Sequence, residues 1–93
     1  MNTEKALQLI ERERERQVTL KNQGRFRYTC ADAELSDAEK LTILVEEVGE
    51  VARQVLCQPY RPLVMNDEGS REELKKEVIQ IAAIAVNWIR SLG

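Results

Sequence analysis

The stretch LTILVEEVGEV, residues 41–51, decides the fold, because its apolar residues recur with the spacing of one helix face. The apolar stripe on this segment comprises Leu41, Leu44, Val48, Val51 and Val55. Glu47 and Glu50 are three residues apart, so on a helix they project side by side at the margin of that stripe. The pattern predicts an amphipathic helix that carries two carboxylates beside its packing face.

A second stretch, EVIQIAAIAVN at residues 77–87, repeats this arrangement. Its stripe comprises Leu74, Val78, Ile81, Ala82, Ala85 and Ile89, and the flank beside it comprises Glu73, Glu77, Gln80, Ile84 and Asn87. Two such helices packed antiparallel would turn their polar flanks towards each other. Residues 78–89 are apolar nearly all round, which predicts protein neighbours on both sides. We therefore expect an all-α helical bundle whose four-helix core is completed by dimerisation.

Capping signals set the limits of the second and third expected helices. Residues 36–39, SDAE, read as a capping box that starts a helix at Asp37, and Pro59 stops it after Gln58. Residues 70–73, SREE, read as a second capping box, and this helix continues to Leu92. The first helix is expected from Thr3, as its cap, to roughly Leu20 or Lys21, and Gly24 prevents its continuation. Residues 22–35 are expected to hold a strand-like piece or a partial turn.

Length and charge restrict the class of protein. The chain has 93 residues, enough for one small domain spanning 1–93, and a domain this short gains from oligomerisation. Its 14 basic and 16 acidic residues give a net charge of −2, which offers no global attraction to nucleic acid or to an anionic membrane. No apolar run reaches the roughly 18 to 20 residues that cross a bilayer. The start of the chain lacks the pattern of a secretory signal, so we expect a cytoplasmic protein.

The residue types also restrict the chemistry. The chain has no histidine, which excludes Ser-His-Asp and Cys-His catalysis, HExxH zinc sites and Glu-x-x-His di-iron sites. Cys30 and Cys57 form no CxxC pair, and we expect both thiols to be reduced. Oxygen atoms remain as metal ligands, and these favour Mg²⁺, with Mn²⁺ as the alternative.

The acidic residues of the two flanks are the candidate metal ligands. A single ExxE pair is usually a solvated helix face, but here a second acidic block lies in the same phase on the next helix. Glu47, Glu50 and Glu77 would repel one another without a cation between them. Mg²⁺ normally shares its coordination between one or two carboxylates and the phosphates of a ligand, so the ligand set predicts a phosphate-bearing substrate.

The order of these blocks, EExxE at 46–50, then 26 residues, then ExxQ at 77–80, resembles that of the MazG-like nucleoside triphosphate pyrophosphohydrolases. These are all-α enzymes whose signature is EExxE followed by ExxD. Residues 73–83 look like the second block of the family, and residues 13–17 with Gly24 are similar to the first helix of short phage and mobile-element relatives. Gln80 departs from the family pattern, since most members carry aspartate at that position.

The resemblance implies hydrolysis of a nucleoside triphosphate, ribo or deoxy, to the monophosphate and pyrophosphate. It implies that Glu47, Glu50 and Glu77 hold Mg²⁺, with Gln80 as a weaker neutral ligand. Glu46 would orient water or a nearby lysine, so Glu46 and Glu47 are the catalytic candidates. No covalent nucleophile is required.

Four further residues are candidates for contact with the substrate. Asn87 could read a sugar or base, or instead bond across a helix interface. Gln17 and Arg14 could contact the nucleotide, although the alternating charges of residues 11–16 favour a solvated face with i,i+4 ion pairs. Phe26 could stack on a base or cover the core.

Two other functions remain open on sequence grounds. One is a non-catalytic helical oligomer that binds nucleotide or a protein partner and has lost turnover with the change at Gln80. The other is a structural helical module with a fortuitous acidic face. For the enzyme, the expected partners are the nucleoside triphosphate and further copies of the chain, as a homodimer or homotetramer, with neither nucleic acid nor membrane involved.

Overall fold

A computed structural model describes residues 1–25, 28–56 and 68–93 of the chain. It contains three helices, α1 (Thr3–Asn22), α2 (Asp37–Leu56) and α3 (Glu68–Leu92), and the described residues include no strand. The all-α prediction is thereby confirmed, while the four-helix core concerns a second copy that one chain does not contain. Within the same ranges, none of the helices is both long and apolar enough to span a membrane.

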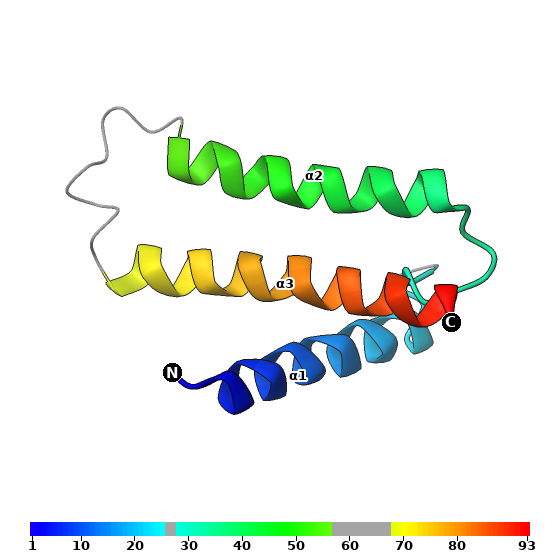
Figure 1. The fold of residues 1–93 in the computed structure, drawn as a ribbon, viewed down its shortest axis with the longest axis horizontal. Coiled ribbons are helices and arrows are strands. Elements are labelled where there is room, and N and C mark those ends of the chain that lie inside the picture. Colours follow the sequence, from blue (N-terminus) through cyan, green and yellow to red (C-terminus); the bar gives the residue numbers. More distant parts are fainter. Residues whose placement is uncertain (26–27, 57–67) are drawn as a thin grey trace.

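Helix α3 is the centre of the fold and lies between the other two (Figure 1). It packs against α1 on one side and against α2 on the other. Figure 1 shows α2 antiparallel to α3, whereas α1 runs in roughly the same direction as α3 and crosses it obliquely. Two neighbours for residues 78–89 were expected from their nearly uniform apolar character, and α1 and α2 of the same chain supply both.

The ends of α1 follow local backbone chemistry. Asn2, and not the predicted Thr3, is the N-cap, because its side-chain oxygen accepts the Lys5 backbone N–H at 2.8 Å. At the other end Gly24 has a φ of 77°, and the two N–H groups of residues 24 and 25 return to the carbonyls of Lys21 and Leu20, both at 2.9 Å. This is the Schellman arrangement, and it ends the helix where Gly24 was expected to end it.

The segment between α1 and α2 forms turns, so the alternative of a strand-like piece is wrong for its described residues. The Asp32 carboxylate holds this segment together, since it accepts the Thr29 backbone N–H at 2.7 Å and the Lys21 ammonium at 2.6 Å. Burial is moderate here, and the pKa of Asp32 is lowered chiefly by the Lys21 hydrogen bond and then by the Thr29 backbone N–H. The turn therefore docks onto the end of α1.

The start of α2 is the predicted capping box. Ser36 Oγ accepts the Glu39 N–H, and Glu39 accepts the Ser36 N–H, each at 3.1 Å. The predicted end at Gln58 and Pro59 lies outside the described residues. Helix α3 begins at Glu68, so the prediction of a start at Ser70 is wrong. A serine followed by a glutamate three residues later marks a place where a helix can begin, but it does not prevent the helix from beginning a turn earlier.

The buried faces differ from the predicted stripes. On α3 the buried residues are Ala83, Ile84 and Asn87, whereas Val78 and Ile89 of the predicted stripe are 49% and 66% exposed. On α2 the predicted stripe residues Leu41, Val48 and Val55 are likewise exposed in the single chain. Ile84 and Asn87 of the predicted α3 flank are therefore buried, whereas Glu73 of the same flank and Glu50 of the α2 flank are exposed.

Two glycines should respond oppositely to alanine. Gly24→Ala should destabilise the protein by about 1 kcal/mol, because a side chain disfavours the positive φ of this position. Gly49→Ala, where an added Cβ meets no atom within 4 Å, should stabilise α2 by roughly 0.5–1 kcal/mol. Urea unfolding of both variants measures this, and a change of the same sign in both would contradict the description of these two sites.

Candidate functional site

Three carboxylates converge where α2 and α3 pack together. Glu47 and Glu50 come from α2 and Glu77 comes from α3, and each offers one oxygen such that all three oxygens lie within 4.8 Å of one another. The antiparallel pairing of the two helices produces this, because each helix presents residues three apart on the side that faces the other. The structure therefore brings together three of the four ligands expected from the sequence.

Burial and mutual repulsion act on this acidic cluster, which we define as Glu47, Glu50 and Glu77. The pKa of Glu77 is raised, first by burial and then by the nearby charges of Glu50 and Glu73, against a smaller lowering by a hydrogen bond from Gln54. The pKa of Glu47 is also raised, first by burial and then by repulsion from Glu50, Glu77 and more distant carboxylates. Both shifts express the cost of placing negative charges together away from water.

One atom of the cluster lacks any partner. Glu77 Oε2 is buried and accepts no hydrogen bond. A buried oxygen without a donor is unfavourable, and a divalent cation held by oxygen atoms would satisfy it and remove the repulsion at the same time. The chemistry of these donors therefore fits a hard cation such as Mg²⁺.

The remaining two motif residues differ in position. Gln80 is half-buried on α3, one turn after Glu77, and lines a pocket together with Glu47. Glu46 is exposed on α2 and does not belong to the acidic cluster. It acts on the cluster at a distance, since its charge contributes to the raised pKa of Glu47.

The pocket has a volume of about 330 Å³ and lies beside the acidic cluster, with which it shares Glu47. All three helices and the turn after α1 contribute to its wall. The lining residues are Glu13, Arg16, Gln17, Tyr28, Thr29, Cys30, Ile43, Glu47, Gln80 and Ile84. Pockets of about 300–1,000 Å³ take small organic ligands, so this one has room for such a ligand.

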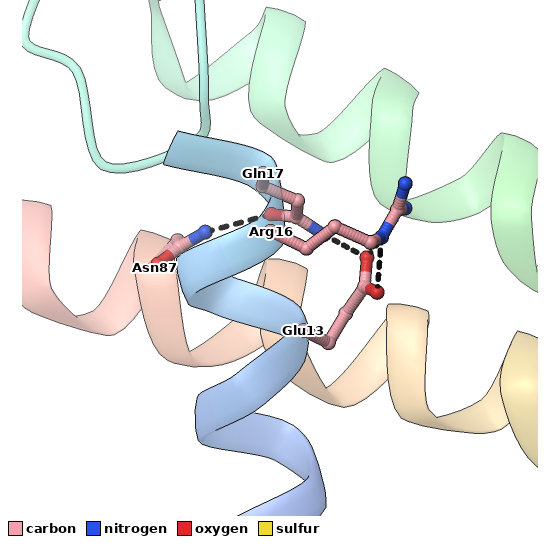
Figure 2. Close-up of polar contacts among 4 residues, drawn as sticks. All are labelled: Glu13, Arg16, Gln17 and Asn87. Carbon is pink, nitrogen blue, oxygen red and sulfur yellow. Dashed lines mark hydrogen bonds and ion pairs between the residues drawn. The ribbon is translucent and has the colours of Figure 1, made fainter. Parts of the chain in front are cut away.

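A chain of side-chain hydrogen bonds connects α3 to α1 (Figure 2), and three of its members, Glu13, Arg16 and Gln17, line the pocket. Asn87 Nδ2 donates to Gln17 Oε1 at 3.0 Å, and Gln17 Nε2 donates to Glu13 Oε2 at 3.1 Å. Arg16 then binds both Glu13 oxygens, through Nε at 2.7 Å and Nη2 at 2.8 Å. Gln17 is buried and lines the pocket, while its predicted contact with the nucleotide stays a prediction.

Arg14 and Asn87 lie behind this wall. Arg14 Nε donates to Asn87 Oδ1 at 2.7 Å, and Arg14 also pairs with Glu11 on its own helix. Asn87 is only 2% exposed and does not line the pocket. It was expected either to read a sugar or base or to bond across a helix interface, and the structure shows the second, between α3 and α1 of the same chain. Arg14 likewise contacts Asn87 and not the pocket. Phe26, the fourth candidate, lies outside the described residues.

The start of α2 and the end of α3 are joined by two further bonds that fix the register of the acidic cluster. Lys40 is buried and its Nζ donates to Ser91 Oγ at 2.8 Å. Trp88 Nε1 donates to Asp37 Oδ1 at 2.9 Å. Because both bonds connect α2 to α3, they oppose sliding of one helix along the other.

Several residues of the pocket were not singled out from the sequence. Glu13 and Arg16 belong to the alternating charge run of residues 11–16. Glu13 could have been found from its position four residues before Gln17, because residues with this spacing lie on the same helix face. Thr29 and Cys30 lie in a turn with no helical period. Cys30 carries a free, buried thiol whose pKa is raised by burial, which a nearby Lys40 charge partly offsets.

No protein-family model, curated protein or solved structure matches this chain. The likeness to the MazG-like enzymes therefore rests on the residues of its two acidic blocks and on the segment around residues 13–17.

Removing one carboxylate should change how stability depends on pH. The pKa of Glu77 in the folded protein lies above its ordinary value of 4.5, so its contribution to stability is present at low pH and is lost as the pH rises through the raised pKa. Glu77→Gln should therefore stabilise the metal-free protein at pH 7 and leave its stability unchanged near pH 4. The expected gain at pH 7 is about 1 kcal/mol, which is the lower end of the free-energy cost of leaving a buried polar group unsatisfied.

Thermal unfolding in EDTA at pH 4 and pH 7 measures this difference, with the exposed Glu15→Gln as the matched control. Adding about 10 mM Mg²⁺, roughly a hundred times a typical weak dissociation constant, should then raise the melting temperature of the wild type more than that of Glu77→Gln. If Glu77→Gln is less stable than the wild type at pH 7 without metal, the three carboxylates do not destabilise the folded protein by repelling one another.

Proposed function

We propose that this protein is a Mg²⁺-dependent nucleoside triphosphate pyrophosphohydrolase, which converts a ribo- or deoxynucleoside triphosphate to the monophosphate and pyrophosphate. The observation that carries the proposal is the acidic cluster, with one buried and unsatisfied Glu77 oxygen, beside a pocket that shares Glu47 with it. Together these offer a place for a metal-bound phosphate chain and a place for the rest of the nucleotide. The cytoplasm, where nucleoside triphosphates are abundant, would be its compartment.

The acidic cluster would hold the ion, with the Gln80 amide oxygen as a neutral additional ligand. Bound there, Mg²⁺ would neutralise charge on the phosphate oxygens as the reaction proceeds. Three carboxylates that repel one another when empty become favourable ligands once a cation lies between them. Their convergence therefore supports a cation site better than it supports an ordinary solvated surface.

In the reaction itself, water attacks a phosphorus atom of the triphosphate, the phosphoanhydride bond breaks, and pyrophosphate leaves. A carboxylate must orient the water and take its proton. Glu47 is the candidate for this, because it belongs to the acidic cluster and also lines the pocket, so its carboxylate lies between the proposed sites of the ion and of the nucleotide. Glu46 is exposed next to it and would orient water at the entrance of the site.

A second candidate, a nucleotide-binding helical protein without turnover, is favoured by one residue. Gln80 stands where most of the MazG-like enzymes that the chain resembles carry aspartate, and a neutral amide binds a divalent cation more weakly than a carboxylate. Such a protein would keep the pocket and the polar chain behind it while hydrolysing nothing.

Pyrophosphate release from a panel of ordinary and modified triphosphates with Mg²⁺ separates these candidates. The wild type should turn over at least one of them, and Glu50→Gln should lower kcat/KM by about a hundredfold, because charge stabilisation by a metal is worth several kcal/mol. Glu72→Gln, an exposed glutamate on α3, is the control and should retain activity. Nucleotide binding without release from any substrate would favour the second candidate.

We also propose that two copies of the chain associate through α2, as a homodimer or as half of a homotetramer. One face of α2 is apolar and exposed in the single chain: Leu41, Val45, Val48 and Val55 are 50%, 59%, 46% and 41% exposed. Their spacing of four, three and seven residues is that of a helix–helix seam. Pairing this face with its copy would place α2 and α3 of both chains in one four-helix core, consistent with the small size of the domain.

Val45→Lys should disrupt this association, because it places a charge in the centre of the apolar face. Light scattering after size-exclusion chromatography should give a multiple of 10.7 kDa for the wild type and the monomer mass for the variant. Leu7→Lys, at a similarly exposed position on α1, should leave the mass unchanged. A wild type that is monomeric at high concentration, or a Val45→Lys protein that stays associated, would contradict this assembly.

A further inference from the structure

We propose that the pocket binds the base of the nucleotide and selects bases that carry an exocyclic amino group, namely cytosine, adenine or guanine, over thymine and uracil, with Glu13 as the residue that determines this specificity. The inference rests on the proposed function, since it names the substrate class of that site. It is carried by the direction of the hydrogen bonds that reach Glu13.

The chain of bonds behind the pocket can run in one direction only. Arginine has N–H donors and no acceptor, so the Asn87 oxygen must be the atom that faces Arg14 Nε. The Asn87 amide nitrogen then faces Gln17, whose oxygen accepts from it at 3.0 Å. This leaves the Gln17 nitrogen to donate to Glu13. Each amide is thus oriented by the one before it, and the chain ends on a carboxylate, which can only accept.

Glu13 retains capacity to accept one more bond. A carboxylate has about four lone-pair sites, and Glu13 uses three: Oε2 accepts from Arg16 and Gln17, while Oε1 accepts only from Arg16 Nε. Its side chain is 12% exposed and lines the pocket, so a ligand is the natural source of the fourth donor. The two bonds from Arg16 hold both Glu13 oxygens in a fixed position at the pocket wall.

The other walls suit a flat, largely apolar ring. Ile43 and Ile84 contribute aliphatic surface from α2 and α3, and Tyr28 lines the same pocket from the turn after α1. Glu47 and Gln80 complete it, which connects it to the proposed metal site and sets the orientation: phosphates towards the acidic cluster, base towards Glu13.

A fixed acceptor discriminates between the bases by their donors. An exocyclic amino group offers an N–H that reaches out from the ring and can approach Glu13 Oε1. Thymine and uracil have one ring N–H, flanked by two carbonyl oxygens, and these oxygens would be repelled by the carboxylate as the N–H approached. Thymine or uracil would leave the Glu13 oxygen without a donor or place a carbonyl oxygen against it, and either outcome lowers the affinity for these bases strongly.

Binding of nucleosides without phosphates, and without metal, tests this inference separately from catalysis. Titrations of deoxycytidine, deoxyadenosine, deoxyguanosine and thymidine into ¹⁵N-labelled protein, followed by NMR, should show the three amino nucleosides binding at least about tenfold more tightly than thymidine, the effect of one hydrogen bond to a charged acceptor. Amide signals around Glu13 and Gln17 should shift. Glu13→Gln should reduce this preference to less than about threefold, and the exposed Glu15→Gln should retain it.

If Glu13→Gln fails to fold, the order of the four nucleoside affinities of the wild type tests the inference by itself. Equal binding of thymidine and the amino nucleosides, binding of none of them, or a preference that survives in folded Glu13→Gln would each overturn the inference. Pyrophosphate release without a preference for amino bases would remove this inference and leave the proposed function intact. The ranked binding of nucleosides without any pyrophosphate release would remove the enzymatic proposal and leave the pocket assignment.

Discussion

The mutual repulsion of Glu47, Glu50 and Glu77 is the constraint around which the rest of the structure is arranged. Their oxygens lie within 4.8 Å of one another at the contact of α2 and α3, and burial raises the pKa of two of them. A fold gains nothing from such a cluster by itself, since like charges in a partly buried site oppose folding. A ligand that brings positive charge converts the same arrangement from a cost into a binding site.

The scaffold holds these charges together by making α3 the shared neighbour of both other helices (Figure 1). On the α2 side, Lys40 and Trp88 contribute bonds that fix the register of the two helices. On the α1 side, Asn87 accepts from Arg14 and donates to Gln17, so a polar chain occupies the place where an apolar contact would be usual. Buried polar networks of this kind favour one arrangement, because a shift of either helix breaks their hydrogen bonds.

The sequence predicted some of this and missed the rest for identifiable reasons. The capping box at Ser36 and the end of α1 at Gly24 depend on neighbouring residues only, and both predictions are confirmed. The convergence of the acidic pairs followed from helical spacing. The buried face of α3 did not, because periodicity cannot tell which side of a nearly uniformly apolar helix meets two neighbours. Glu13 was missed because its carboxylate stands in an alternating charge run, and only the fold shows that it faces inward.

The account depends most on whether the three carboxylates share one divalent ion. Anomalous diffraction from crystals grown with Mn²⁺, a substitute for Mg²⁺ at oxygen ligands, tests this directly. The account predicts a manganese peak coordinated jointly by Glu47, Glu50 and Glu77. Carboxylates that point into separate regions of solvent, with no ion between them at saturating Mn²⁺, would contradict it.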